Sequence, residues 1–352
     1  MYIAGIGTVF NQGRGIEALQ NALAQATPKP EFSEQFRSRM PLYPVDKETL
    51  KDKGLFKKMR RADRFNRMAV MAAVDAHNDS SLQFESEKRE LGVIVSSALG
   101  PHATTFKYID GILEYGDNHT SPTQFTHSVH NITASYINNV LECRGPTFTV
   151  SQFALSLHHA LIQAAAWLAE GRCKHVLVGA VDELSTVMEY IVSEKTNIAK
   201  DGYIRPFTCS GKPVAAPGEG SVFLLLTYAP PEKYYAEISA VEYTATEPGQ
   251  SDVLLLDCDG MAGDESLYLP EIPANQDVAS YTPLFGSTIS NTAFNVAAGV
   301  LMLRQQYQFA SPNQDNPHGL NILTKSTKRD LSRIACLKRS NIFKNGSITL
   351  ER

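Results

Sequence analysis

The stretch from Gly145 to Glu183, GPTFTVSQFALSLHHALIQAAAWLAEGRCKHVLVGAVDE, constrains the fold more than any other part of the chain. A β-rich run from Thr147 changes abruptly into an alanine-rich helical segment, which ends at Gly171. A second strand with buried character follows over residues 175–180. The order strand, helix, strand predicts a βαβ unit, and this unit places the chain among the α/β proteins.

The rest of the first half repeats this alternation of strand and helix. Residues 2–7 form a short apolar strand, and residues 16–24 have the apolar spacing of a helix. The continuous apolar run LGVIVSSALG at residues 91–100 is typical of a parallel strand that is covered on both faces. The first half is therefore predicted to contain a buried parallel sheet.

The second half, from about residue 231, repeats the plan more weakly and ends in the strand-like NGSITLER. We therefore predict a layered αβαβα fold built from two similar halves, at about residues 1–230 and 231–352. No long linker separates the halves, so one domain is expected to span residues 1–352.

The composition excludes several classes of function. The net charge of -4 and the 20% of charged residues give no reason to expect nucleic acid or an anionic membrane as partner. No apolar run reaches the roughly 20 residues that a membrane span needs, and the N-terminus lacks the pattern of a signal peptide. The five cysteines lack paired short spacings, which favours the reducing cytoplasm. They are Cys143, Cys173, Cys209, Cys258 and Cys336.

Cofactor and metal sites are not expected either. The glycines of GIGTVFNQGRG do not give the spacing Gly-x-Gly-x-x-Gly of a dinucleotide-binding turn. His127 and His130 are three residues apart, but no cysteine or carboxylate lies near them at ligand spacing. Ordinary polar or interface roles are the better prediction for both histidines.

The junction between strand and helix near residue 154 is where acyl-transfer enzymes place a nucleophile, because the helix dipole favours an anion there. GPTFTVSQFALSL at this junction resembles the nucleophile motif of the β-ketoacyl synthases. Further segments that resemble motifs of that family are YIRPF from Tyr203, GEGSVFLLL from Gly218, DCDGMAG from Asp257, GSTISNTAF from Gly286 and PNQDNP from Pro312. The resemblance covers essentially the whole chain and implies a thiolase-like fold.

The resemblance also implies that the catalytic residues of the family are missing. Counted without gaps, the family's cysteine falls on Ala154 and its first histidine on Asp259. The lysine falls on Ile289 and the second histidine on Phe294. Without a thiol no acyl-enzyme forms, and without the imidazoles nothing assists malonyl decarboxylation. A carboxylate at Asp259 is further expected to repel an incoming malonyl group.

Synthase relatives without the cysteine include the chain length factors, which pair with an active ketosynthase and shape the shared acyl tunnel. The resemblance therefore implies a heterodimer with a ketosynthase, to which an acyl carrier protein brings the acyl or malonyl chain. SPTQFTHSVHNITAS from Ser121 looks like the chain length factors of bacterial aryl polyene pathways, a type II polyketide route. Many chain length factors carry glutamine at the cysteine position, whereas Gln152 lies two residues earlier, so a decarboxylating role through it is not expected.

The resemblance also indicates where the tunnel wall lies. In homodimeric relatives the loop in the register of residues 121–130 reaches into the neighbouring subunit and contacts the end of its acyl chain. Gln124, Phe125 and Val129 are therefore expected to limit chain length. Phe106 and Ile109, on the preceding segment, are expected to add to this wall.

Two other functions remain open. The chain could be a malonyl-carrier decarboxylase or an unusual acyltransferase of the same fold. It could also be a homodimeric scaffold that holds carrier proteins. The basic segment FKKMRRADR from Phe56 is either a solvated helix face or a docking patch for an acidic carrier protein.

Overall fold

A mixed β-sheet forms the centre of the protein. The computed structural model describes residues 1–34, 39–84, 89–243, 250–261, 263–289, 292–339 and 345–352. Within these residues, 12 strands form one sheet in the order β15-β13-β12-β17-β18-β11-β1-β10-β7-β5-β6, with β2 paired to β1. The strands of this sheet are β1 (Tyr2–Phe10), β2 (Gly13–Arg14), β5 (Leu91–Ser96), β6 (Thr147–Val150), β7 (His175–Asp182), β10 (Gly220–Thr227), β11 (Glu237–Tyr243), β12 (Val253–Leu256), β13 (Asp277–Ala279), β15 (Asn321–Ile322), β17 (Arg333–Lys338) and β18 (Gly346–Glu351).

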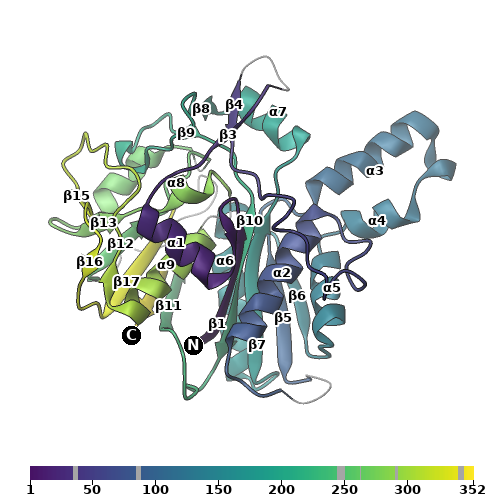
Figure 1. Ribbon diagram of the computed structural model, residues 1–352, viewed down its shortest axis with the longest axis horizontal. Helices are drawn as coiled ribbons and strands as arrows, with labels where there is room; N and C mark the ends of the chain where they lie inside the picture. Colours follow the sequence, from purple (N-terminus) through teal and green to yellow (C-terminus); the bar gives the residue numbers. More distant parts are fainter. Residues whose placement is uncertain (35–38, 85–88, 244–249, 262, 290–291, 340–344) are drawn as a thin grey trace.

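Helices cover and separate the two halves of the sheet (Figure 1). Residues of α6 and α9 pack in one apolar core with β1, β7, β12, β17 and β18, and so form a central layer. Residues of α2 and α5 form a second core against the outer face of β1, β5, β7 and β10. The helices are α1 (Gly15–Gln25), α2 (Arg64–Asp79), α3 (His102–Tyr115), α4 (Pro122–Ser128), α5 (Ile132–Leu141), α6 (Ser156–Ala169), α7 (Thr186–Lys195), α8 (Thr282–Phe285) and α9 (Thr292–Gln305).

Shorter elements connect these layers. Paired strands outside the main sheet are β3 (Glu31–Ser33) with β4 (Met40–Leu42), β8 (Asn197–Ile198) with β9 (Val214–Ala215), and β14 (Tyr307–Gln308) with β16 (Thr327–Lys328). The 3-10 segments are η1 (Asp117–His119), η2 (Phe153–Leu155), η3 (Pro206–Thr208) and η4 (Glu265–Glu271).

The predicted βαβ unit is confirmed. β6 and β7 both pair in parallel with β5, and α6 connects them. The eight residues of β10 are all buried, as are the six of β5, because these strands lie between two helical layers and consist mainly of aliphatic residues. The expected strand over residues 91–100 is shorter, since β5 ends at Ser96 and a loop leads from there to α3.

The second half is layered as predicted, but its outer face is thinner than that of the first half. β12 pairs in parallel with β13 and β17, and Tyr2 pairs with Glu237 where β1 meets β11. On the outer face, Phe207 of η3 and Tyr268 of η4 pack against β12, β13 and β17. Among the described residues, 3-10 segments thus cover the face where the first half has long helices.

One part of the first half projects from this body. α3 and α4 pack against each other and extend away from the sheet, at the right of Figure 1. His102 is the one buried residue of α3, and His127 is the one buried residue of α4. We refer to residues 102–129 as the arm.

Candidate functional site

Ala154 lies in a tight turn at the start of α6. It is in η2, between the end of β6 and the first residue of α6, and its side chain is almost fully buried. The preceding Phe153 has a positive φ of 48°, which is uncommon for a residue with a side chain. Ser156 fixes the turn, because its Oγ accepts from the backbone N–H of Gln152 at 2.8 Å and donates to the carbonyl of Ser97 at 3.0 Å. The turn therefore presents a methyl group at this point.

Asp259 is one member of a buried ionic network at the end of β12. Lys338 Nζ, at the end of β17, lies 2.6 Å from Asp259 Oδ2 and 3.1 Å from Asp257 Oδ2. The side chains of all three residues are at most 1% exposed. The two carboxylates keep the pKa of Lys338 above its usual value although burial opposes this. Burial, with a contribution from Asp257, raises the pKa of Asp259 to about 6. The expected free carboxylate at residue 259 is thus an ion-paired group.

Hydrogen bonds hold the loop after β12 in place around this network. Asp259 Oδ1 accepts from the backbone N–H of Met261, and Glu265 Oε1 accepts from that of Gly260, both at 2.8 Å. Thr292, the first residue of α9, donates from its hydroxyl to Asp257 Oδ2 at 2.6 Å. We call Asp257, Asp259, Lys338 and these hydrogen bonds the closed site.

Phe294 and Ile289 are in apolar surroundings. The ring of Phe294 stacks on Phe285 with 4.3 Å between centroids and lies edge-on to Phe10 at 6.0 Å. Gly220 gives it room, since a Cβ at that residue would lie 2.8 Å from the Phe294 ring. Ile289 packs, partly buried, against the core that contains Met188. Neither residue can transfer a proton.

Contacts connect the surroundings of these positions, because Lys338 pairs with Asp259 and Thr292, two residues before Phe294, donates to Asp257. Asp259 follows the end of β12, and Ile289 and Met261 line the same small cavity of about 20 Å³. His158 lies one turn beyond Ala154 on α6, and burial together with the charge of Lys338 lowers its pKa to about 3. Residue 262 of DCDGMAG, residues 290–291 of GSTISNTAF, and residues 340–344 lie outside the described residues.

The residues expected at a tunnel wall lie on the arm. Phe106, Ile109, Phe125 and Val129 are all exposed, and Phe125 is 55% exposed. Gln124 is half-buried and faces α3, where its Oε1 would lie 3.9 Å from a Cβ at Gly111. The structure thus places the five residues on one helical hairpin, but it leaves most of their apolar surface uncovered.

Sequence reasoning missed further exposed apolar residues near this surface. Leu113 is 80% exposed and Tyr115 is 62% exposed, both toward the end of α3. The spacing of Phe106, Ile109 and Leu113, at i, i+3 and i+7, is the signal that could have revealed Leu113. Phe148 on β6 is also exposed, and β6 is the last strand at its edge of the sheet within the described residues. An exposed edge strand can pair with a strand of another chain.

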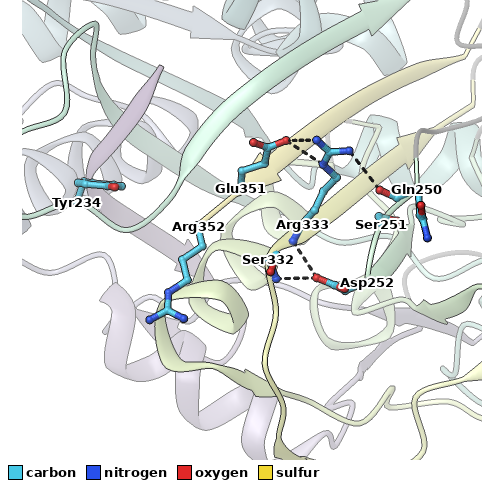
Figure 2. Close-up of a pocket in the computed structure, with 8 residues that line it drawn as sticks. All are labelled: Tyr234, Gln250, Ser251, Asp252, Ser332, Arg333, Glu351 and Arg352. Atoms are coloured by element: carbon cyan, nitrogen blue, oxygen red, sulfur yellow. Dashed lines mark hydrogen bonds and ion pairs between the residues drawn. The ribbon is translucent and has the colours of Figure 1, made fainter.

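Two surface hollows differ in character. One, of about 460 Å³, is lined by Leu50, Phe56 and Met59 with Lys51, Asp52, Lys53 and Arg67 around them, and so includes part of the basic segment. The other, of about 790 Å³, lies near the start of β12 and β17 (Figure 2). Three of its charged residues are paired, because Arg333 pairs with Glu351 at 2.6 Å and Asp252 accepts from the backbone N–H groups of Ser332 and Arg333. It lies at the opposite end of β12 from Asp259.

The described residues hold neither a metal-ligand cluster nor a membrane-spanning helix. In the part of the chain that the structure describes, no three His, Cys, Asp or Glu side chains are grouped so that they could hold a metal ion. His127 instead contacts Tyr136, with 3.0 Å between Nε2 and the hydroxyl. None of the described helices is long and apolar enough to cross a membrane.

The sequence matches a known family over most of its length. The family model of the β-ketoacyl synthase N-terminal domain matches residues 2–230. The 3-oxoacyl-[acyl-carrier-protein] synthase 2 of Vibrio harveyi is 24% identical over 131 residues. This match covers 37% of the chain and 32% of that relative, so it spans about a third of the relative's length.

Two solved structures share the fold over nearly the whole chain. A β-ketoacyl synthase from Burkholderia phymatum STM815 has a TM-score of 0.83 and 17% identity, and the match covers 100% of this chain and 98% of that one. The ishigamide ketosynthase/chain length factor has a TM-score of 0.82 and 14% identity, covering 99% and 98%. At these identities the likeness establishes the fold.

Proposed function

The chain belongs to the β-ketoacyl synthase family, and we propose that it acts there as a non-catalytic, chain-length-factor-like subunit. The proposal rests on the identity of the residues at the closed site and around it. The positions in register with the family's catalytic residues hold Ala154, the ion-paired Asp259, Ile289 and the stacked Phe294.

These residues leave no route to condensation by this chain alone. Claisen condensation in the family passes through an acyl-cysteine, and Ala154 supplies no nucleophile. Removing a single oxyanion donor typically costs about 10² to 10³ in rate, and Phe294 and Asp259 replace two imidazoles. Asp259 is moreover held by Lys338 at 2.6 Å, so it is not free to act as a base. The cysteine and histidines would therefore come from a partner.

The exposed arm and the edge of the sheet support an active ketosynthase of the same fold as that partner. The arm presents apolar residues of a kind that soluble proteins rarely leave uncovered in a group. In the part of the chain that the structure describes, β6 forms an unpaired edge of the sheet, with Phe148 exposed. A stable interface of this type buries upward of about 2,000 Å². A solved structure of similar fold is a ketosynthase/chain length factor, which agrees with such pairing.

Within that heterodimer the proposed mechanism is steric. Phe106, Ile109, Gln124, Phe125 and Val129 would form the floor of the acyl tunnel of the partner. Elongation would slow when the chain reaches these side chains. We place the substrate among polyene or polyketide chains made by a type II system, with aryl polyenes as the first choice, in the cytoplasm.

An acyl carrier protein would bring the acyl or malonyl chain. Carrier proteins are acidic, and the hollow beside Phe56 combines an apolar floor with Lys51, Lys53 and Arg67. Lys57 and Lys58 are also exposed next to it. This arrangement favours docking of an acidic helix that carries one apolar side chain.

The pairing is tested by co-expression with the ketosynthase of the same gene cluster, followed by size-exclusion chromatography with light scattering. We expect a one-to-one complex. A stable homodimer of this chain that binds carrier protein and ignores the synthase would replace the proposal with the scaffold function.

A further inference from the structure

The first turn of α3 is one of the places where the arm is attached to the body, together with the contact of His127 with Tyr136 of α5 and the packing of α3 on α7. Of the 14 residues of α3, His102 alone is buried, and it is the first. Thr104 donates from its hydroxyl to Asp63 Oδ2 at 2.7 Å, and Thr105 donates to the carbonyl of Ser128 within the arm at 3.1 Å. Beyond this turn α3 packs mainly against α4. How the first turn is held therefore contributes to the direction of the arm.

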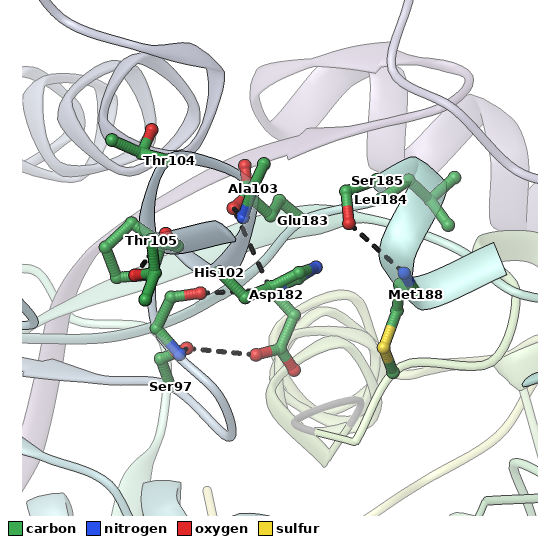
Figure 3. Close-up of polar contacts among 12 residues, drawn as sticks. Ser97, His102, Ala103, Thr104, Thr105, Asp182, Glu183, Leu184, Ser185 and Met188 are labelled. Carbon is green, nitrogen blue, oxygen red and sulfur yellow. Dashed lines mark hydrogen bonds and ion pairs between the residues drawn. The ribbon is translucent and has the colours of Figure 1, made fainter. Parts of the chain in front are cut away.

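Two adjacent carboxyl groups at the end of β7 hold the segment that leads into α3 (Figure 3). Asp182 Oδ1 accepts from Ser97 Oγ at 3.1 Å and from the backbone N–H of Ala98 at 3.0 Å. Glu183 Oε1 accepts from the backbone N–H of Ala103, the second residue of α3, at 2.9 Å. Early N–H groups of a helix have no partner within the helix, so Glu183 satisfies one of them from another element.

We propose that Glu183 is a positioning residue that fixes the first turn of α3 to β7 and thereby orients the arm toward its partner subunit. The inference rests on the proposed function, because it takes the arm as the surface that binds the ketosynthase. It adds a residue that does not itself contact the partner.

The surroundings of Glu183 make this contact sensitive to its protonation. The groups that face it are His102 of α3, with Nδ1 at 3.8 Å, Asp63 and Arg64 at the start of α2, and Glu219 before β10, and Asp182 precedes it as the last residue of β7. Burial, together with the charges of Asp63 and Glu219, raises the pKa of Glu183 to about 8, while Arg64 and the Ala103 N–H act in the opposite direction.

The stabilising contribution of Glu183 therefore falls as the pH rises. A carboxyl whose folded pKa lies above its unfolded value of 4.5 stabilises the folded contact fully below about pH 4.5, and this contribution is lost as the pH rises to about 8. Glu183→Gln keeps an acceptor oxygen but cannot ionise. Glu183→Ala removes the acceptor.

The first test uses the isolated full-length chain and amide hydrogen exchange of residues 98–110, corrected for the intrinsic rate at each pH. We expect Glu183→Ala to exchange about five- to tenfold faster at Ala103 than the native chain, as for the loss of one buried hydrogen bond. Glu183→Gln should match the native chain at pH 5 and be more protected at pH 8. Glu232→Ala, which removes an exposed carboxyl, serves as the control. Native exchange in Glu183→Ala would overturn the inference.

The second test measures the dissociation constant of the complex with the ketosynthase. Glu183→Ala should weaken binding about five- to tenfold, and native binding should weaken from pH 6 to 8 while that of Glu183→Gln stays level. Unchanged binding by Glu183→Ala would overturn the positioning role. If the native chain fails to pair at all, the proposed function fails, and the exchange experiment still decides whether Glu183 holds α3.

Discussion

The closed site buries charged side chains, whereas the arm exposes apolar ones. At the closed site, three charged side chains are buried, paired within 3.1 Å and surrounded by hydrogen bonds. On the arm, large apolar side chains such as Leu113 and Phe125 face outward. In most soluble proteins charged residues lie outside and apolar residues inside.

The difference indicates which groups are satisfied within the chain and which need a partner. A buried ion network satisfied from within has nothing left to offer a substrate, whereas an uncovered apolar hairpin is complete only when something packs on it. A catalytic subunit would show the reverse, with an open polar chamber. This contrast supports the proposal that the partner carries out the chemistry and that this chain shapes the tunnel.

The largest expected effect comes from breaking the closed site. Lys338→Met leaves Asp257 and Asp259 buried without their cation, so the free energy of unfolding should fall by about 3–5 kcal/mol. Urea denaturation measures this. Lys58→Met is the matched control, because Lys58 pairs with Glu142 at the surface and should change the free energy by less than about 1 kcal/mol. Equal effects of the two substitutions would show that the network is not a structural element.

Breaking the arm should give the opposite pattern, with little change in stability and a large change in binding. Leu113→Asp and Phe125→Asp should each raise the dissociation constant of the ketosynthase complex by about 30-fold, equivalent to about 2 kcal/mol. The isolated chain should unfold within about 0.5 kcal/mol of native, since both residues are exposed. Leu267→Asp places the same charge on η4, where Leu267 is also exposed. If Leu267→Asp weakens the complex as much, the arm is not the binding surface.

A third prediction distinguishes residues of the arm that limit product length from residues that bind the partner. Val129→Ala and Phe125→Ala remove volume from the expected tunnel floor, so the complex should release products longer by one or more extension units. Mass spectrometry of the released chains reads this out while chromatography confirms that the complex is intact. An unaltered length distribution from an intact complex would remove both residues from the wall.

The last prediction concerns the pH dependence of the closed site. Because burial raises the pKa of Asp259 to about 6, its contribution to stability is complete below about pH 3.8 and is lost as the pH rises to about 6. The slope cannot exceed about 1.4 kcal/mol per pH unit. Asp259→Asn should flatten the profile of unfolding free energy between pH 4 and 6. Parallel profiles for the two proteins would show that Asp259 does not titrate in this range.

Much of the fold could be predicted from the sequence because its strongest signals are local. The run of aliphatic residues at β5 and β7 and the sharp change from β6 to α6 each occur within a few neighbouring residues. The thinner outer face of the second half could not be predicted, since it depends on which segments pack on β12 and β13 across long stretches of chain.

The candidate site was predicted less completely, for the same physical reason. Ala154, Asp259, Ile289 and Phe294 were singled out by register, but Lys338 was not. Lys338 is 79 residues from Asp259 and is the last residue of an aliphatic strand. The neighbouring sequence therefore gives no sign that Lys338 is the buried counter-ion of Asp257 and Asp259. Glu183 and Ala103 are likewise 80 residues apart. Pairings between distant elements become visible when the fold brings the strand ends together.

The central claim, that this chain shapes a tunnel and does not catalyse, is tested most directly by a malonyl-elongation assay. The assay compares the native complex, a complex whose ketosynthase has its catalytic cysteine replaced by alanine, and this chain alone. We predict extended products from the native complex, and none from the other two. Condensation or malonyl decarboxylation by this chain alone would contradict the account.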